Sequence, residues 1–180
     1  MVERCDRDRA NLSNQRAAAM SRLREYEGGD DGPCLYWANL VRQTKSQRGQ
    51  AFLRELLVAL EALPDKKLIE NAIVQDGCSC SLGALAVHRR VAAGENRDAV
   101  LAELAAINVD IDDSAWDGEE ILPWATHALA APFYLADQIA SINDDEGGND
   151  ETRSTARYDR MVKWLQSQIF EIDVAREVES

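Results

Sequence analysis

The chain has 180 residues, of which 46% are hydrophobic and 29% are charged, and its formal net charge is −12. This balance is ordinary for a globular protein and excludes wholesale disorder. The sequence has no run near the roughly eighteen apolar residues that a membrane-spanning helix needs, so no such helix is expected.

The length suits one hydrophobic core, and no linker rich in Pro, Gly or Ser divides the chain. We therefore expect a single domain over 1–180, with 1–32 as a peripheral N-terminal helix and 173–180 as a frayed tail. The first residues lack an apolar signal core, which predicts a cytoplasmic protein. In that compartment the four cysteines should be thiols.

Four helices are predicted in the first half of the chain. Residues 8–27 have apolar side chains at helical spacing, and a second helix begins at Pro33. Residues 50–63 carry a wide apolar stripe that Pro64 ends, which makes this segment the candidate for the central core helix. Apolar side chains at i, i+1, i+4 and i+5 predict a further helix over 65–76.

After the turn signal Asp76-Gly77, Ser79 or Ser81 is expected to cap a helix that Gly94 ends. Another helix is predicted over 97–107 and a loop over 108–120.

Pro132 suits the first residue of a helix through Ile142, and Thr152 or Ser154 could cap a last helix. Alternating strand patterns with hairpin turns are absent, so the sequence predicts an all-α, single-domain bundle of six to eight helices.

Acidic residues are concentrated in one part of the chain. Residues 98–152 contain no Lys or Arg but fourteen Asp and Glu, and apolar helix patterns run through the same segment. This combination predicts an acidic face on a folded body, which attracts basic partners and repels nucleic acid. Acidic faces also serve solubility alone, and this alternative stays open.

Arg42, Lys45 and Arg48 are basic residues close together in the sequence. Three such residues are too few to bind nucleic acid directly in so acidic a chain. Carboxylates at suitable spacing can instead take the place of phosphates on a basic groove. Trp116 and Trp124 flank several of these carboxylates, and an aromatic anchor beside charges is typical of interfaces. The candidate partner-binding residues are Asp112, Asp113, Trp116, Asp117, Glu119, Glu120, Asp144, Asp145, Glu146, Asp150 and Glu151.

Metal and catalytic sites have weaker support. Cys78 and Cys80 are one residue apart and no second ligand pair exists, unlike the usual zinc spacing. Cys80 near a helix start suits a thiol of lowered pKa, and His88 is available, so an enzyme dependent on metal or cysteine is an alternative. The acidic loop from Asn143 fails the EF-hand pattern, because Ser154 stands where the pattern requires Glu. We expect no cofactor, no metal and no catalytic residue.

Several sequence segments together carry a resemblance to known proteins, and they are Ser46 to Leu53, Leu63 to Ile69, Gly77, Cys80 to Ala84, Ile142 to Glu146, Trp164, Gln168 and Ile169. On these segments the chain resembles a group of small uncharacterised proteins encoded by bacteriophages and prophages of proteobacteria. The resemblance covers roughly 46–92 and 133–170, and no activity is attached to the group.

The resemblance implies a host bacterial cytoplasm, where small acidic accessory proteins often bind and disable host machinery. The resulting hypothesis is a non-enzymatic, acidic protein-binding module. It would inhibit a host nucleic-acid-handling or defence complex through a face that imitates DNA. Its partner would be a host protein or protein–nucleic-acid complex with a basic surface, with no direct contact to nucleic acid or membrane. A structural homodimer, associating through an apolar helix face with Phe133, Leu135 and Ile139, is a further alternative.

Overall fold

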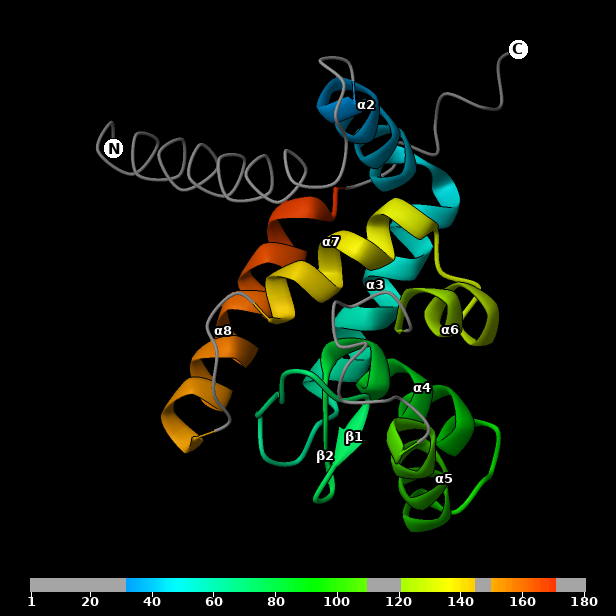
Figure 1. The fold of residues 1–180 in the computed structure, drawn as a ribbon, viewed down its shortest axis with the longest axis vertical. Coiled ribbons are helices and arrows are strands. Elements are labelled where there is room, and N and C mark those ends of the chain that lie inside the picture. The colour runs from blue at the N-terminus through cyan, green and yellow to red at the C-terminus, as the bar shows by residue number, and fades with distance from the viewer. Residues whose placement is uncertain (1–31, 110–120, 145–149, 171–180) are drawn as a thin grey trace. The chain divides into compact units, whose positions relative to one another are not determined.

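The computed structural model describes residues 32–109, 121–144 and 150–170. Within these residues it contains seven α-helices, numbered α2 to α8, and one two-stranded hairpin (Figure 1). The prediction of an all-α fold with six to eight helices is therefore confirmed.

The predictions at the two ends of the chain stay untested. The expected helix over 8–27 and the tail over 173–180 lie outside the described residues. By its contacts the chain divides into two compact units, Met1–Arg42 and Gln43–Ser180. The expectation of one domain over the full length remains a prediction.

The described part of the first unit is most of helix α2 (Gly32–Lys45), which begins one residue before the predicted Pro33. Tyr36 and Trp37 meet edge to face there, with ring centroids 5.9 Å apart. Arg42 Nη2 donates a hydrogen bond of 2.8 Å to Asn39 Oδ1, one turn earlier. These are contacts between close neighbours along one helix.

Helix α3 (Gln47–Glu61) opens the core of the second unit. Ser46 caps it, because the Ser46 hydroxyl accepts a hydrogen bond of 2.9 Å from the Gly49 amide. The helix ends before Pro64, as predicted. Its inward side chains Leu53, Leu56 and Leu60 are fully buried against neighbours that include α4 and α8.

The predicted helix over 65–76 is wrong. The chain instead forms strands β1 (Val74–Gln75) and β2 (Cys78–Ser79), which pair antiparallel. The turn residues Asp76 and Gly77 both have positive φ, 51° and 77°, as a two-residue hairpin turn of this kind requires.

The apolar side chains of this segment are buried as the spacing suggested, namely Leu68, Ile69, Ala72 and Ile73. Their backbone, however, bonds to other segments. The Leu68 amide donates to the Ser154 carbonyl (3.1 Å), and the Ile69 amide donates to the Ser79 carbonyl (3.2 Å). Positive φ at Lys66 and Asn71 also interrupts any helix here.

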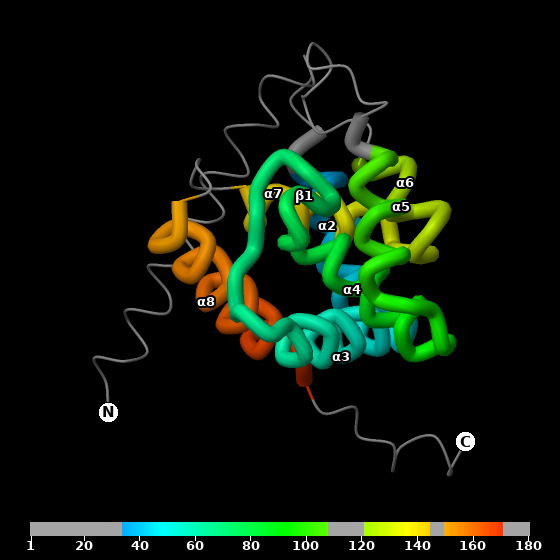
Figure 2. Tube along the Cα trace, turned by 90° about the horizontal axis from the view of Figure 1, so that it is seen from below, coloured from blue at the N-terminus to red at the C-terminus, as the bar shows by residue number. Residues whose placement is uncertain are grey.

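Helix α4 (Ser81–Ala92) follows β2 and lies in the middle of the second unit, in contact with α3 and α7 and with α5 (Arg97–Val109) (Figure 2). Its cap is Cys80, whose sulfur accepts from the Gly83 amide (3.3 Å), so the prediction of Ser79 or Ser81 as cap is wrong. Gly83 permits the close packing, since a Cβ there would lie 2.1 Å from the Ile73 carbonyl oxygen.

Helix α6 (Ile121–Ala128) packs against α7 (Phe133–Asn143). Pro132, the predicted first residue of α7, is its cap instead, so the helix begins one residue later than predicted. Two arginines hold the loop between these helices. Arg48 Nη2 donates to the Ala130 carbonyl (2.5 Å), and Arg89 Nη1 donates to the Leu129 carbonyl (2.7 Å).

The last helix, α8 (Glu151–Gln168), has Asp150 as its cap, so neither Thr152 nor Ser154 takes that role. Its apolar side buries Met161 and Leu165 completely. Gln50 of α3 fixes the end of α8. Its side-chain amide donates to the carbonyls of Thr44 (2.8 Å) and Gln168 (3.0 Å), and its oxygen accepts from the Phe170 amide (3.2 Å).

The apolar face considered for self-association does not exist in the form predicted. Leu135 and Ile139 are both fully buried inside the unit, and of the three side chains only Phe133 is exposed. A homodimer through this face would therefore have a single apolar anchor. In the part of the chain that the structure describes, no helix combines the length and apolar character needed to cross a membrane.

Candidate functional site

Most of the predicted partner-binding residues cannot be placed. Only Asp144, Asp150 and Glu151 belong to the described residues. Those that lie outside them are Asp112, Asp113, Trp116, Asp117, Glu119, Glu120, Asp145 and Glu146.

Asp150 and Glu151 both have partners within the fold. Asp150 Oδ1 accepts from the Arg153 amide at the start of α8 (3.1 Å), and Asp150 Oδ2 lies 3.1 Å from Arg153 Nε. Glu151 Oε1 lies 3.1 Å from Lys67 Nζ. Both carboxylates stand at the positive end of the helix dipole, which stabilises the helix start.

A buried arginine, Arg157, lies in α8 two turns after the start of the helix. The sequence analysis did not predict it as a structural or functional residue. Arg157 is 1% exposed. Its Nε donates to the Asn143 carbonyl (2.6 Å), its Nη1 to the Leu68 carbonyl (2.9 Å) and its Nη2 to Glu70 Oε2 (3.1 Å). One guanidinium therefore joins α8, the end of α7 and the segment before β1.

Asn143 continues this network toward the start of α4. Its Oδ1 accepts from the Ser81 amide and hydroxyl, both at 3.1 Å. Its Nδ2 donates to the Ile69 carbonyl (2.7 Å) and to Asp144 Oδ1 (2.9 Å). Every polar atom of the buried side chain is thus used, which fixes the end of α7 against α4.

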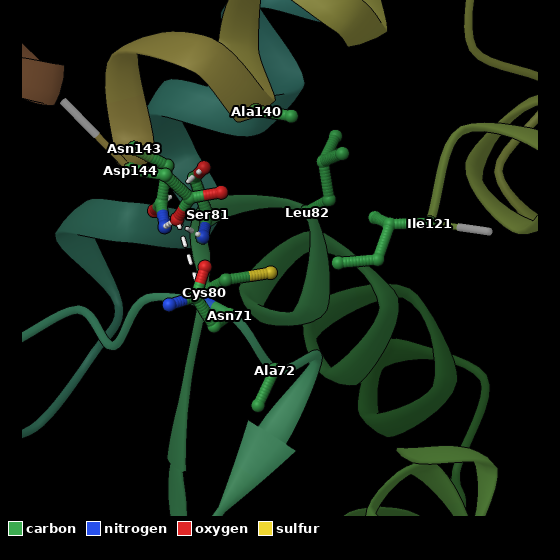
Figure 3. A pocket seen from close by; sticks show the side chains of 9 residues that line it. All are labelled: Asn71, Ala72, Cys80, Ser81, Leu82, Ile121, Ala140, Asn143 and Asp144. Atoms are coloured by element: carbon green, nitrogen blue, oxygen red, sulfur yellow. Dashed lines mark hydrogen bonds between the residues drawn. The ribbon is translucent and has the colours of Figure 1, made fainter. Parts of the chain in front are cut away.

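A small pocket opens beside Asn143 (Figure 3). The cavity has a volume of about 10 Å³, which is room for about one water. Polar and apolar side chains lie on different sides of it, with Ser81, Asn143 and Asp144 apart from Leu82 and Ile121. The remaining lining residues are Asn71, Ala72, Cys80 and Ala140.

The pocket lies where two acidic segments join the described fold. Ile121 directly follows Glu120 in the chain, and Asp144 directly precedes Asp145. Both Ile121 and Asp144 line the pocket. The attachment points of 110–120 and 145–149 are therefore neighbours in space, although the two segments are far apart in sequence.

Asp144 is the carboxylate at the edge of this pocket. Its Oδ1 accepts from Asn143 Nδ2 and, at 3.4 Å, from the Asn71 amide. Burial raises the pKa of the Asp144 carboxyl above its usual range, and this effect outweighs the two hydrogen bonds and the more distant Arg157, which lower the pKa. The ionised form is thus under-compensated within the fold.

Cys80 also lines the pocket, but its chemistry differs from the sequence-based alternative. Burial raises the pKa of the Cys80 thiol to about 12, and the hydrogen bond from the Gly83 amide only partly offsets this effect. A nucleophilic or metal-binding cysteine needs the opposite shift. Among the described residues, no three His, Cys, Asp or Glu side chains come close enough together to hold a metal ion.

The described part of the chain is electrically neutral. It contains thirteen Lys and Arg and thirteen Asp and Glu. Many of these charges pair internally, as in Arg89 with Glu55 and Arg90 with both Glu95 and Glu103. Residues 110–120 and 145–149 contain eight Asp and Glu and no Lys or Arg, so they account for −8 of the net charge of −12.

The chain matches no protein family, no curated protein and no solved structure.

Proposed function

We propose that this chain is a protein-binding module that binds a partner with a basic surface through the acidic segments 110–120 and 145–149. The single observation that carries the proposal is the separation of charge. The described fold is neutral, whereas these two segments contain eight carboxylates and no Lys or Arg. Their attachment points at Ile121 and Asp144 border one pocket.

A neutral fold with internally paired charges has little long-range attraction for a partner. Two segments that carry eight carboxylates and no Lys or Arg supply negative charge, which accelerates encounter with a basic surface. Because such attraction is screened by ions, binding should weaken as salt increases.

The specific form of this function is inhibition of a nucleic-acid-handling or defence complex. Carboxylates would occupy the places of phosphates on a basic groove, so the chain would compete with the nucleic acid for the partner. The resemblance to phage and prophage proteins favours a bacterial host protein as that partner.

Affinity capture from a bacterial lysate at low and high salt tests the proposal, with captured proteins identified by mass spectrometry. We expect a dominant partner with a basic surface that is lost at high salt. A variant with Asp112, Asp113 and Asp117 changed to Asn and Glu119 and Glu120 changed to Gln should capture at least about tenfold less of it.

A matched control removes the same number of charges from exposed positions of the described fold. It carries Asn at Asp65, Asp76, Asp98 and Asp159 and Gln at Glu61. The control should retain capture. Equal loss in both variants would mean that only total charge matters, and capture unchanged by either variant or by salt would exclude the proposal. Competition by duplex DNA for the captured partner then tests the inhibitory form.

A further inference from the structure

The outer side of α3 leaves apolar side chains exposed. Helices α4 and α8 pack against the buried side of α3 (Figure 2). On the other side Ala51 and Val58 are exposed, and 52% of the surface of Val58 is accessible. Seven residues separate the two, so they lie nearly in line along the helix. Phe170, 43% exposed, borders this side, since its carbonyl accepts from Arg54 Nη2 (2.6 Å).

The charges on the same side of α3 are placed against the helix dipole. Arg48 lies in the first turn and Glu61 is the last residue of the helix, and both are exposed. The dipole favours acidic residues at the start of a helix and basic residues at its end. The first turn of α3 has no acidic residue and the last turn has no basic one. The helix by itself therefore gains nothing from this arrangement, and a local rule broken in this way is typical of a contact surface.

Neither charge is paired inside the described fold. Arg48 Nη2 donates to the Ala130 carbonyl (2.5 Å), which carries no net charge. Lys66 Nζ donates to the backbone carbonyl of Glu61. Among the described residues, neither Arg48 nor Glu61 takes part in an ion pair. Both can therefore pair with charges of another molecule.

The order of these residues makes α3 complementary to itself. Arg48 lies three residues before Ala51, and Glu61 lies three residues after Val58. In two antiparallel copies of α3, with Ala51 of one copy opposite Val58 of the other, Arg48 of each copy lies at the level of Glu61 of the other. A two-fold axis makes each of these contacts twice.

We propose that α3 forms a two-fold symmetric, antiparallel contact with α3 of a second copy of this chain. Val58 packs against Ala51 of the other copy near the axis, and Arg48 pairs with Glu61 of the other copy toward each end. The contact covers exposed apolar side chains and gives partners to two charges of each copy. One helix face makes a small interface, so the dimer should be weak and reversible. The inference goes beyond the proposed function, because the acidic segments are not part of the contact.

Sedimentation velocity of the full chain over a range of concentrations tests the dimer. At about 0.15 M salt the Debye length is about 8 Å, so the repulsion between two acidic chains is largely screened. The wild type should show a dimer whose fraction rises with concentration. Val58→Arg should weaken the dimer at least about tenfold, because it places a cation near Arg48 of the other copy.

A charge exchange tests the antiparallel pairing. Arg48→Glu and Glu61→Arg should each weaken self-association at least about tenfold, because each brings like charges together twice. An equimolar mixture of the two variants should recover the dimer, since every Arg then meets a Glu. Both substitutions agree with the helix dipole, so the separate variants should stay folded, which circular dichroism checks.

Arg97→Glu and Asp98→Arg form the matched control pair. They make the same charge changes at exposed positions of α5, which packs against α4 and β1. Each should dimerise as the wild type does. A wild type that stays monomeric at every concentration would overturn the proposal. A dimer that the α3 variants leave unchanged, or a mixture that does not recover it, would also overturn it. None of these outcomes affects the capture of a basic partner, so the proposed function is tested separately.

Discussion

Arg157 and Arg89 perform similar tasks at different depths in the fold. Each pairs with a glutamate and donates to the backbone of another segment. Arg157 and its partner Glu70 have side chains 1% and 11% exposed, whereas Arg89 and Glu55 are 32% and 38% exposed. Arg89 makes the shorter and bidentate pair, with distances of 2.7 and 2.5 Å.

Burial, more than the geometry of the ion pair, determines how much each arginine contributes to the stability of the fold. The half-exposed pair competes with water and salt, so its net contribution to stability is small. Loss of the buried guanidinium removes one donor each from a carboxylate and from two carbonyls, and water cannot replace these donors easily. The comparison predicts that the better-formed ion pair is the less important one for stability.

The largest effect is expected for Arg157→Ala. Three acceptors, on Asn143, Leu68 and Glu70, lose the buried donor that Arg157 provides, so the free energy of unfolding should fall by about 3–5 kcal/mol. Urea denaturation followed by circular dichroism measures this change. Arg153→Ala on the exposed side of the same helix should cost about 0.5 kcal/mol or less. Similar losses in the two variants would contradict the role of burial.

Arg89→Ala should cost about 1 kcal/mol, because the variant loses a half-exposed pair and the hydrogen bond to Leu129. Added salt should shrink the difference from the wild type. The hydrogen bond from Arg89 lowers the pKa of Glu55, so the stabilisation by this pair is present above the unfolded pKa and is lost as pH falls through the folded pKa. Denaturation from neutral to acidic pH should therefore show the two proteins converging.

The smallest effect has the opposite sign. Because burial raises the pKa of Asp144, its ionised form destabilises the fold at neutral pH, and this cost disappears as pH falls through the folded pKa. Asp144→Asn should raise the melting temperature at neutral pH, by the equivalent of about 1 kcal/mol or less. The gain should vanish at acidic pH. A variant that is less stable at neutral pH would mean that the charge of Asp144 has a compensating partner.

The helices were predictable where apolar side chains repeat at helical spacing over several turns. The segment 50–63 fits α3 closely because propensity, periodicity and Pro64 all agree. The segment 65–76 misled the prediction because its apolar spacing fits a buried irregular chain as well as a helix. Local spacing could not reveal that the amides of Leu68 and Ile69 bond to distant carbonyls.

The helix caps show a different limit. Cys80 lies between the two serines predicted as caps of α4, Ser79 and Ser81. Asp150 lies two residues before Thr152, one of the two residues predicted to cap α8. Several residues near each helix start could accept the hydrogen bond, and the exact start depends on how the preceding segment packs.

The candidate site was only partly visible in the sequence. Counting charges located the acidic segments but could not tell which of the other charged residues pair within the fold, as Arg89 does with Glu55. The burial of Arg157 could have been predicted from the sequence, because Arg157 lies at helical spacing between Ser154 and Met161 on the buried side of α8. A charged residue within an apolar stripe deserved consideration as a buried, fully bonded group. The pocket itself joins residues 71, 81, 121 and 144, and no local pattern predicts such a meeting.

The hydrogen bonds of Gln50 have a consequence for the order of folding. They join α3 to Gln168 and Phe170, which lie 118 and 120 residues later in the chain. Closing so long a loop carries a large entropic cost before any contact repays it. We therefore expect the end of α8 to dock late, after α3 and α4 have formed their closer contacts. Changes at Gln50 should then mainly accelerate unfolding and leave the folding rate nearly unchanged.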